Sequence, residues 1–273
     1  MNIIPVTVII PVKNEEKNLP NCLDKLGEFA QVIVVDSNST DSTPEIVNKY
    51  GFEYYNFNWN GKFPKKRNWA LRNIYIKNDW IFFLDADEYL TIEFIQELRE
   101  KIFESKYAGF IVYYQNHFMG KKLSFGDKMK KLPIFKKNKG EYEKIDEDSW
   151  SHLDMEVHEH PIIEGEIGVF KNHILHNDYK GLEQYIARHN AYSTWEAKRY
   201  IHIKNSNKKH FTFRQRIKYS LFKSYFLPML YFVYSYIIKL GVIDGSAGYF
   251  LAKYKANYFF QIRTKIIELS NRE

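Results

Sequence analysis

Three carboxylates follow an apolar stretch in the first third of the chain. Residues 80–84 (Trp-Ile-Phe-Phe-Leu) lead directly into Asp85, Asp87 and Glu88. Crowded carboxylates repel one another unless a cation lies between them, and hard oxygen ligands suit Mg²⁺ or Mn²⁺. The spacing therefore predicts that Asp85 and Asp87 serve a metal-bound phosphate. The alternative is that Asp87 or Thr91 only caps the next helix.

Two earlier apolar stretches also end in polar residues. Residues 6–11 precede Asn14 and Glu15, and residues 32–35 precede Asp36. Short apolar runs of this kind predict strands that are buried on both faces of a parallel sheet. Right-handed crossovers bring the carboxyl ends of such strands to one edge, where open α/β sheets bind their ligands. Together the three polar groups predict a cleft at that edge.

Helical patterns alternate with the strands, which predicts βαβ units and a mostly parallel sheet flanked by helices. Helices are expected over residues 18–29, 44–50, 91–105 and 179–201, with another opening at residues 65–71, and further strands over residues 52–57, 109–114 and 173–176. We expect an α/β catalytic domain over residues 1–201. Residues 202–273 are expected to form a helical C-terminal appendage.

Composition limits the class of protein. The 273 residues are 45% hydrophobic and 27% charged, which is typical of a globular chain. The single cysteine, Cys22, excludes an internal disulfide framework and a Cys-rich zinc site. Residues 1–5 lack the pattern of a signal peptide, so we expect a cytoplasmic protein. The net charge of +7 favours an anionic partner: a nucleotide, a nucleic acid or an anionic lipid surface.

The polar segments and their order resemble the signatures of family 2 glycosyltransferases. These segments are Pro-Val-Lys-Asn-Glu-Glu at 11–16, Val-Asp-Ser-Asn-Ser-Thr-Asp-Ser-Thr at 35–43 and Leu-Asp-Ala-Asp-Glu at 84–88. The resemblance implies a GT-A nucleotide-sugar fold and transfer with inversion, usually with a divalent metal. Residues 67–71, 157–159 and 243–245 resemble a narrower branch, the lipopolysaccharide-core β-glucosyltransferases, along nearly the whole chain.

The resemblance also implies a role for individual residues. Pro11 and Val12 would flank the uracil, Glu15 would meet the uridine, and Asp36 would accept a hydrogen bond from the uracil imide. Asp85 would contact the ribose or a metal-bound water, and Asp87 would coordinate Mn²⁺ or Mg²⁺ on the diphosphate.

Lys66 and Arg67 stand near a helix start, where positive charge and backbone donors favour phosphate. The alternative for them is a solvated basic helix face.

Residues 154–160 (Asp-Met-Glu-Val-His-Glu-His) offer candidates for the base that an inverting transferase needs. Matching the narrower branch, we expect Glu159 to be that base, with Glu156 and Asp154 as alternatives. His158 is either functional or a structural histidine. By the same resemblance, His176 is expected as a late metal or diphosphate ligand. The histidines lack the spacing of a zinc hydrolase.

Two basic regions remain open to interpretation. Residues 116–142 hold six lysines between 128 and 139, which form either a solvated face or a loop that meets an anionic acceptor. Residues 211–238 join basic residues to an apolar, aromatic run, which suits a membrane-interfacial segment. The alternative for residues 211–238 is a buried helical subdomain or a dimer face.

The resemblance thus implies a transferase that moves a hexose, in first place glucose, from a UDP-sugar to a lipid-linked lipopolysaccharide or lipo-oligosaccharide core. It would work at the inner face of the cytoplasmic membrane. One alternative is another acceptor: a capsule precursor, a polyprenyl phosphate or a protein. The other is a non-enzymatic anion binder, but no usual nucleic-acid motif occurs, so we expect no nucleic-acid partner.

Overall fold

The computed structural model describes residues 3–103, 106–148, 150–151, 153–154, 161–205, 219–222 and 224–271. By contacts among its residues, the chain divides into two units. Unit 1 comprises residues 1–117, 128–148 and 152–179, and unit 2 comprises residues 118–127, 149–151 and 180–273. Residues 180–201, expected in the catalytic domain, therefore group by contacts with the C-terminal residues.

Unit 1 is built on a mixed sheet. Its strands are β1 (Ile4–Val12), β2 (Phe29–Asp36), β3 (Glu53–Asn56), β4 (Trp80–Phe83), β5 (Glu88–Tyr89), β6 (Tyr107–Phe118), β8 (Lys130–Lys136), β11 (Glu166–Val169) and β12 (Ile174–His176). The strand order is β3-β2-β1-β4-β8-β6-β12-β5, and β11 pairs with β6. Strands β1 to β4 are parallel, as predicted, whereas β8 runs antiparallel between β4 and β6.

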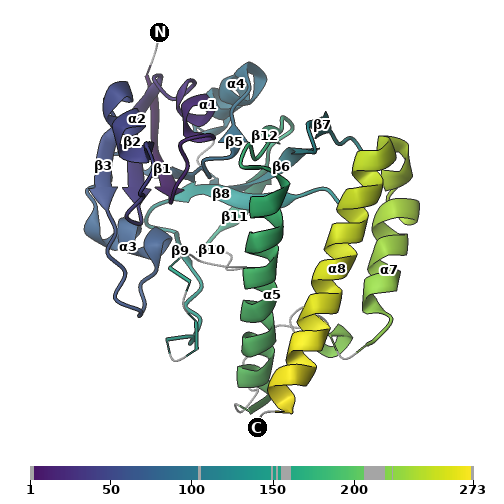
Figure 1. The fold of residues 1–273 in the computed structure, drawn as a ribbon. Coiled ribbons are helices and arrows are strands. Elements are labelled where there is room, and N and C mark those ends of the chain that lie inside the picture. Colours follow the sequence, from purple (N-terminus) through teal and green to yellow (C-terminus); the bar gives the residue numbers. More distant parts are fainter. Residues whose placement is uncertain are drawn as a thin grey trace. The chain divides into compact units, whose positions relative to one another are not determined.

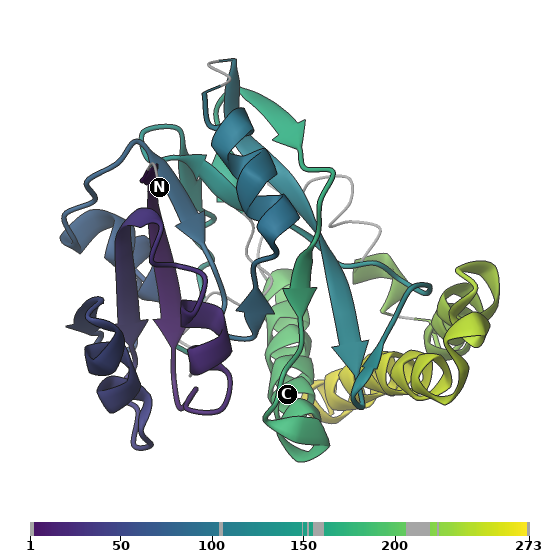
Figure 2. The same cartoon turned by 90° about the horizontal axis from the view of Figure 1, so that it is seen from above.

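Helices cover both faces of this sheet (Figures 1 and 2). They are α1 (Leu19–Leu23), α2 (Thr43–Tyr50), α3 (Lys66–Asn73) and α4 (Ile92–Lys101), and β9 (Gly140–Tyr142) pairs with β10 (Pro161–Ile163) as a separate ribbon. Alternate residues of each central strand enter different cores. In β4, Phe82 packs with residues of α1, α2 and α4, whereas Ile81 and Phe83 pack on the side of α3. This two-sided burial explains why the strands read as uninterrupted apolar runs.

One predicted helix is much shorter than expected. The apolar stripe over residues 18–29 predicted a helix of that length, but α1 covers only Leu19–Leu23. Hydrogen bonds of turn type follow, from Leu26 N to Leu23 O and from Phe29 N to Leu26 O, and Gly27 lies between them. Leu26 is nevertheless fully buried. The apolar spacing therefore predicted the burial of this segment correctly, but it predicted too long a helix.

Unit 2 is mainly helical. It contains β7 (Lys121–Lys122), α5 (Gly181–Asn205), α7 (Leu227–Val233), the π-helix η1 (Tyr234–Ile238), the 3-10 helix η2 (Gly241–Asp244) and α8 (Gly245–Ser270). Ala197 and Ile201 of α5 share an apolar core with Ile262 and Ile266 of α8. The predicted helical C-terminal region is thus confirmed, and its last helix, α8, begins at Gly245.

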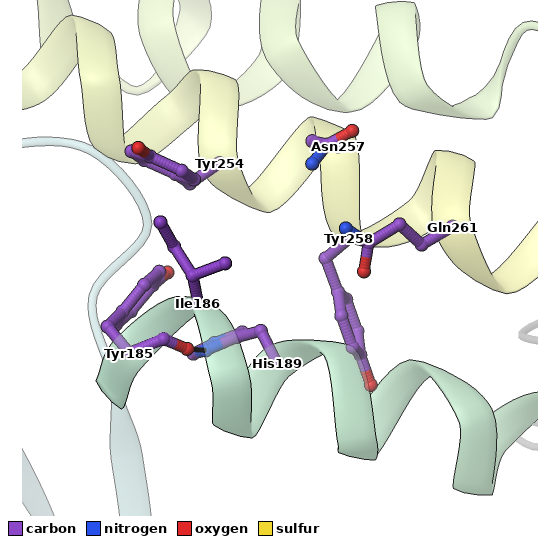
Figure 3. A pocket seen from close by; sticks show the side chains of 7 residues that line it. All are labelled: Tyr185, Ile186, His189, Tyr254, Asn257, Tyr258 and Gln261. Carbon is purple, nitrogen blue, oxygen red and sulfur yellow. Dashed lines mark hydrogen bonds between the residues drawn. The ribbon is translucent and has the colours of Figure 1, made fainter. Parts of the chain in front are cut away.

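A shallow hollow lies between α5 and α8 (Figure 3). Tyr185 and His189 of α5 stack with their ring centroids 3.9 Å apart, and His189 Nδ1 lies 2.8 Å from the carbonyl oxygen of Tyr185. Tyr258 of α8 meets the His189 ring edge-on. The hollow has room for about one water molecule, so these rings mainly pack against one another.

Among the described helices, none is both long and apolar enough to cross a membrane alone. Residues 227–238 and 241–270 meet that requirement only when taken together, and a 75° bend separates them.

Candidate functional site

The carboxyl ends of β1, β2 and β4 lie at one edge of the sheet. Val12 pairs with Asp36 across β1 and β2, and Ile9 pairs with Phe83 across β1 and β4. Pro11, which is partly exposed, and Val12, which is buried, are the last two residues of β1. The parallel register therefore places the residues predicted to contact uracil, Pro11, Val12 and Asp36, beside one another and close to the segment that carries Asp85.

The loops after β1 and β2 are joined by hydrogen bonds. Asn14 N donates to Ser39 Oγ at 2.7 Å, and Glu15 N donates to Thr43 Oγ1 at 2.8 Å. Asn14 adopts a left-handed backbone (φ +54°), which asparagine tolerates better than most residues. The carboxylate of Glu15 accepts from Asn18 Nδ2 at 2.9 Å. The hydroxyls of Ser39 and Thr43 therefore hold the two loops together at the candidate nucleotide end.

Asp36 is fully buried, and both of its carboxylate oxygens accept hydrogen bonds. Oδ1 accepts from Ser39 Oγ at 2.6 Å, and Oδ2 accepts from Tyr54 Oη at 2.6 Å. Burial and the hydrogen bond to Asp36 both raise the pKa of Tyr54. The phenol therefore stays protonated and remains a hydrogen-bond donor. Asp36 thus has a fixed orientation at the sheet edge, and Tyr54 is a partner that the sequence did not predict.

Asp85 lies between two cations. Arg67 Nη2 is 2.7 Å from Asp85 Oδ1, and Lys131 Nζ is 2.5 Å from Asp85 Oδ2. Lys131 also contacts Glu88 Oε1 at 2.6 Å. Burial raises the pKa of Asp85, but the charges of Lys131 and Arg67 outweigh it and lower that pKa below its usual range. Asp85 is therefore an anion that two cationic side chains hold in place, Arg67 from α3 and Lys131 from β8.

Asp87 faces His176, the other predicted metal ligand. His176 Nε2 lies 3.4 Å from Asp87 Oδ2, and the side chains are 27% and 15% exposed. Antiparallel pairing of His176 with Glu88 brings β12 to this segment. Burial raises the pKa of Asp87, but the charge and the hydrogen bond of His176 outweigh it and lower that pKa to about 2. Burial lowers the pKa of His176, but the charge and the hydrogen bond of Asp87 outweigh it and raise that pKa.

The Asp87–His176 pair fits a divalent cation. A carboxylate oxygen and an imidazole nitrogen that face each other can both turn to one ion. Within the described part of the chain, no set of three His, Cys, Asp or Glu residues gathers as a metal site. Such a site would need further ligands, and Mg²⁺-type sites commonly take them from substrate phosphates and water. The donor set therefore suits a metal that binds together with a diphosphate.

Lys66 and Arg67 begin α3 but face different surroundings. Lys66 is only 1% exposed, and its Nζ donates to Val12 O at 2.8 Å. The interpretation of Lys66 as part of a solvated basic face is therefore wrong. Arg67 pairs with Asp85, and its guanidinium carbon lies 5.3 Å from the centre of the Tyr142 ring. Contact of either residue with phosphate stays a prediction.

The predicted base cannot be placed. Glu159 lies outside the described residues, as do Glu156 and His158. Asp154, the remaining carboxylate alternative, is described: its Oδ2 lies 4.0 Å from Lys66 Nζ, and its carbonyl accepts from Lys66 N.

Lys131 was missed by the sequence analysis, which treated residues 116–142 as a solvated face or an acceptor loop. The structure places Lys131 in β8, where its ammonium lies 5.2 Å from the centre of the Tyr114 ring and pairs with Asp85 and Glu88. The apolar residues that follow, Leu132, Ile134 and Phe135, were only a weak signal of the strand, because Pro133 interrupts them.

Comparison with protein families gives an assignment that agrees with this geometry. The model described as glycosyl transferase family 2 matches residues 7–154, more than half of the chain. The matched stretch contains most of β1, all of β2 and β4, and the carboxylates at the ends of β2 and β4, Asp36, Asp85 and Asp87.

Individual relatives extend the comparison. The lipopolysaccharide core biosynthesis glycosyltransferase LpsC of Rhizobium meliloti (strain 1021) is 26% identical over 274 residues, 97% of this chain and 93% of LpsC. A poly(ribitol-phosphate) beta-glucosyltransferase of Bacillus spizizenii is 34% identical over 100 residues, which are 32% of this chain and only 16% of that enzyme.

A solved structure resembles the whole chain. It is the mannosyltransferase PcManGT of Pyrobaculum calidifontis in complex with GDP-Man and Mn²⁺. The TM-score is 0.50 at 14% identity, and the match covers 96% of this chain and 87% of the other. At this identity the likeness concerns the fold alone, and it confirms the expected GT-A architecture.

Proposed function

The chain belongs to glycosyl transferase family 2, and on that premise we propose that it transfers a hexose from a UDP-sugar, in first place UDP-glucose, with inversion. The acceptor would be a hydroxyl of a lipid-linked lipopolysaccharide or lipo-oligosaccharide core. One observation carries the proposal: Asp85 and Asp87, with Arg67, Lys131 and His176 around them, stand where a parallel sheet of this type binds its ligand.

The uridine end of the donor would lie over the joined loops after β1 and β2. Asp36 is the predicted acceptor for the uracil imide, and Pro11 and Val12 flank that position. The rigid loop bonds of Asn14 and Glu15 support this assignment, because a fixed frame lowers the entropy that binding costs.

The diphosphate end would lie over Asp87, with His176 beside it. These two residues would hold Mn²⁺ or Mg²⁺, which when bound supplies a Lewis acid for the charge of the departing diphosphate. Arg67 and Lys131 keep Asp85 ionised and oriented at the same place, so the negative carboxylates of the site are balanced before the donor arrives. Lys66, whose Nζ donates to Val12 O, would stabilise the carboxyl end of β1 beside this site.

Transfer also needs a base for the acceptor hydroxyl. The family resemblance assigns this role to Glu159, which would take the hydroxyl proton as the oxygen attacks the anomeric carbon from the face opposite the diphosphate. Asp154 and Glu156 are the alternatives in the same segment.

The acceptor is inferred from the relatives. LpsC, named for lipopolysaccharide core biosynthesis, matches this chain over almost its whole length, which supports a core saccharide. The poly(ribitol-phosphate) beta-glucosyltransferase matches only 32% of this chain, so it gives less support for its own kind of acceptor. We place the protein in the cytoplasm, at the inner face of the cytoplasmic membrane, where a lipid-linked core would be reached.

The test is a transfer assay with purified protein and defined donors. UDP-glucose, UDP-galactose and GDP-mannose are each offered with a deacylated core oligosaccharide and Mn²⁺, and nucleotide release and product mass are followed. We expect acceptor-dependent UDP release with one UDP-hexose and a β-linked product by NMR. Release only from GDP-mannose, or an α-linked product, would contradict the proposal.

A further inference from the structure

A stripe of exposed apolar side chains runs along residues 225–243, here called the apolar segment. Large apolar residues recur in pairs every four positions: Tyr225 and Phe226, Met229 and Leu230, Val233 and Tyr234, Ile237 and Ile238. Each of these eight side chains is between 38% and 72% exposed. The stripe continues through η2 with Leu240, Val242 and Ile243. Residues four apart share one face of a helix, so the pairs form one continuous surface.

The opposite face of the apolar segment is the one that packs inside unit 2. Tyr231 meets Phe259 of α8 at 4.7 Å between ring centres, Phe232 meets Tyr249 at 5.8 Å, and Ser235 is buried. Figure 1 shows α7 beside α8. The packed face is thus aromatic and partly polar, whereas the exposed face is apolar. A helix that faces water shows the reverse pattern.

The apolar segment is held firmly by polar contacts on its packed side. Asp244, directly after it, accepts from Ser124 N at 3.0 Å and from Phe125 N at 2.9 Å. Tyr231 Oη donates to Asp127 Oδ2 at 2.7 Å. At the turn, a Cβ on Gly248 would meet the carbonyl oxygen of Gly241 at 2.0 Å, so only glycine permits this approach. The stripe is therefore presented by an ordered scaffold.

The sequence that leads into and through the apolar segment is one-sided in charge. Between Glu196 and Asp244 the sequence has no acidic residue, but it has ten basic ones: Lys198, Arg199, Lys204, Lys208, Lys209, Arg214, Arg216, Lys218, Lys223 and Lys239. Asp244 is already engaged by two backbone donors. Lys239 is exposed within the segment, and its Nζ lies 5.4 Å from the centre of the Tyr234 ring.

We propose that the apolar segment is a lipid-binding surface, which inserts its stripe into a bilayer that carries anionic headgroups. Contiguous exposed apolar surface marks an interaction site, and an apolar helix face with aromatic and basic residues beside it suits a membrane interface. Anionic headgroups attract nearby lysine and arginine side chains. The inference specifies how the proposed location at the membrane is reached, but it does not depend on the donor or on the acceptor.

A second copy of the chain fits the same surface less well. Two copies joined through this stripe would bring the exposed Lys239 side chains of both copies toward one interface, and like charges repel. A bilayer with anionic lipid meets both the apolar and the basic character of the region.

The experiment is flotation of the full-length protein with vesicles of phosphatidylcholine, with and without phosphatidylglycerol. We expect the protein to float with the anionic vesicles, and to float less when salt is raised. The double variant Leu230→Glu/Ile237→Glu changes two exposed side chains and should bind at least about tenfold more weakly. Phe103→Glu is the matched control, because Phe103 is 75% exposed in unit 1, and it should bind as the wild type does.

Circular dichroism and thermal unfolding establish that each variant is folded. A wild-type protein that stays with the unbound fraction would overturn the proposal, as would equal binding by the double variant. Light scattering after size-exclusion chromatography tests the second copy: a wild-type dimer that the double variant converts to a monomer would assign the stripe to self-association instead. Because vesicle binding needs neither donor nor acceptor, failure here would leave the proposed transfer reaction intact.

Discussion

Asp87 and His176 are the side chains on which the proposed metal dependence rests. Their facing atoms are 3.4 Å apart, and only these two groups are predicted to hold the cation. We predict that Asp87→Ala lowers kcat/KM for transfer by at least about a hundredfold, because charge on the leaving diphosphate is no longer balanced. Kinetics with saturating Mn²⁺ measure the effect.

The control for Asp87→Ala is Asp79→Ala. Asp79 is an exposed carboxylate just before β4, at the other end of the same strand. The substitution Asp79→Ala should leave both turnover and stability unchanged. Activity of Asp87→Ala that survives at wild-type level, also in EDTA, would refute the metal role.

Lys131 holds Asp85 and the buried Glu88 in one arrangement. Removing its charge with Lys131→Met leaves Glu88, which is 1% exposed, beside Asp85 without the shared cation. Because Lys131 is itself 37% exposed, we expect a loss of only about 1–3 kcal/mol in the free energy of unfolding, along with weaker donor binding. Urea unfolding and titration with UDP measure the two effects.

The neighbouring exposed Lys130 provides the comparison for Lys131. Lys130→Met removes the same charge from the same strand without touching Asp85 or Glu88, so both quantities should stay near wild type. If Lys130→Met and Lys131→Met behave alike, Lys131 has no special role.

At the scale of elements, α4 begins with a cap that α2 lacks. Thr91 accepts from Phe94 N at 3.1 Å, whereas Ser42, before α2, makes no side-chain capping bond. Thr91→Ala should therefore lower the free energy of unfolding by about 1 kcal/mol, and Ser42→Ala by clearly less. Equal losses in thermal or urea unfolding would show that the cap of α4 contributes nothing.

The contact of α5 with α8 adds a pH-dependent term. Burial lowers the pKa of His189, and the positive charges of Arg188 and Lys255 lower it further. The hydrogen bond to Tyr185 O raises it, but by less. The unfolded chain then binds a proton near the ordinary pKa of about 6.5, where the folded chain does not. Stability from neutral His189 is present above that pH and is lost as pH falls below it.

We predict that His189→Gln flattens this acid-side loss, by up to about 1.4 kcal/mol per pH unit. Urea unfolding of wild type and variant on both sides of the transition provides the measurement. Parallel pH profiles would exclude His189 as the source.

Elements differed in how well the sequence predicted them, for physical reasons. Strands β1, β2 and β4 were found because burial on both faces leaves an uninterrupted apolar run. β8 was missed because Lys130, Lys131 and Pro133 interrupt its pattern, and proline argues against a central strand. The structure accommodates it with a register shift, where Phe110 pairs with Ile134 and Val112 with Lys131.

The site shows the same division between local and distant information. Asp36, Asp85 and Asp87 follow predictable strands, so their meeting at one edge could be foreseen. Lys131 reaches Asp85 from β8, which the local pattern did not predict. Tyr54 reaches Asp36 from β3, where a strand was expected but this contact was not. His176 meets Asp87 only because β12 pairs with β5 across a separation that no short-range pattern encodes, so the family resemblance alone indicated it.

At the scale of the whole molecule, the chain combines two kinds of surface. Unit 1 carries the charged edge that suits a nucleotide diphosphate, and unit 2 carries the apolar segment and most of the unbalanced basic residues. The proposed transfer to a lipid-linked acceptor would use both surfaces.

The measurement that tests the central claim most directly is the melting temperature of the protein with UDP, with and without Mn²⁺. A ligand that binds only the folded state stabilises it by about 2.7 kcal/mol at a hundred times its Kd. The account predicts a rise in Tm when UDP and Mn²⁺ are present together, a much smaller one with UDP alone, and loss of the difference in Asp87→Ala. An equal rise with and without Mn²⁺, or no rise with either, would contradict the metal-bound nucleotide site at Asp85 and Asp87.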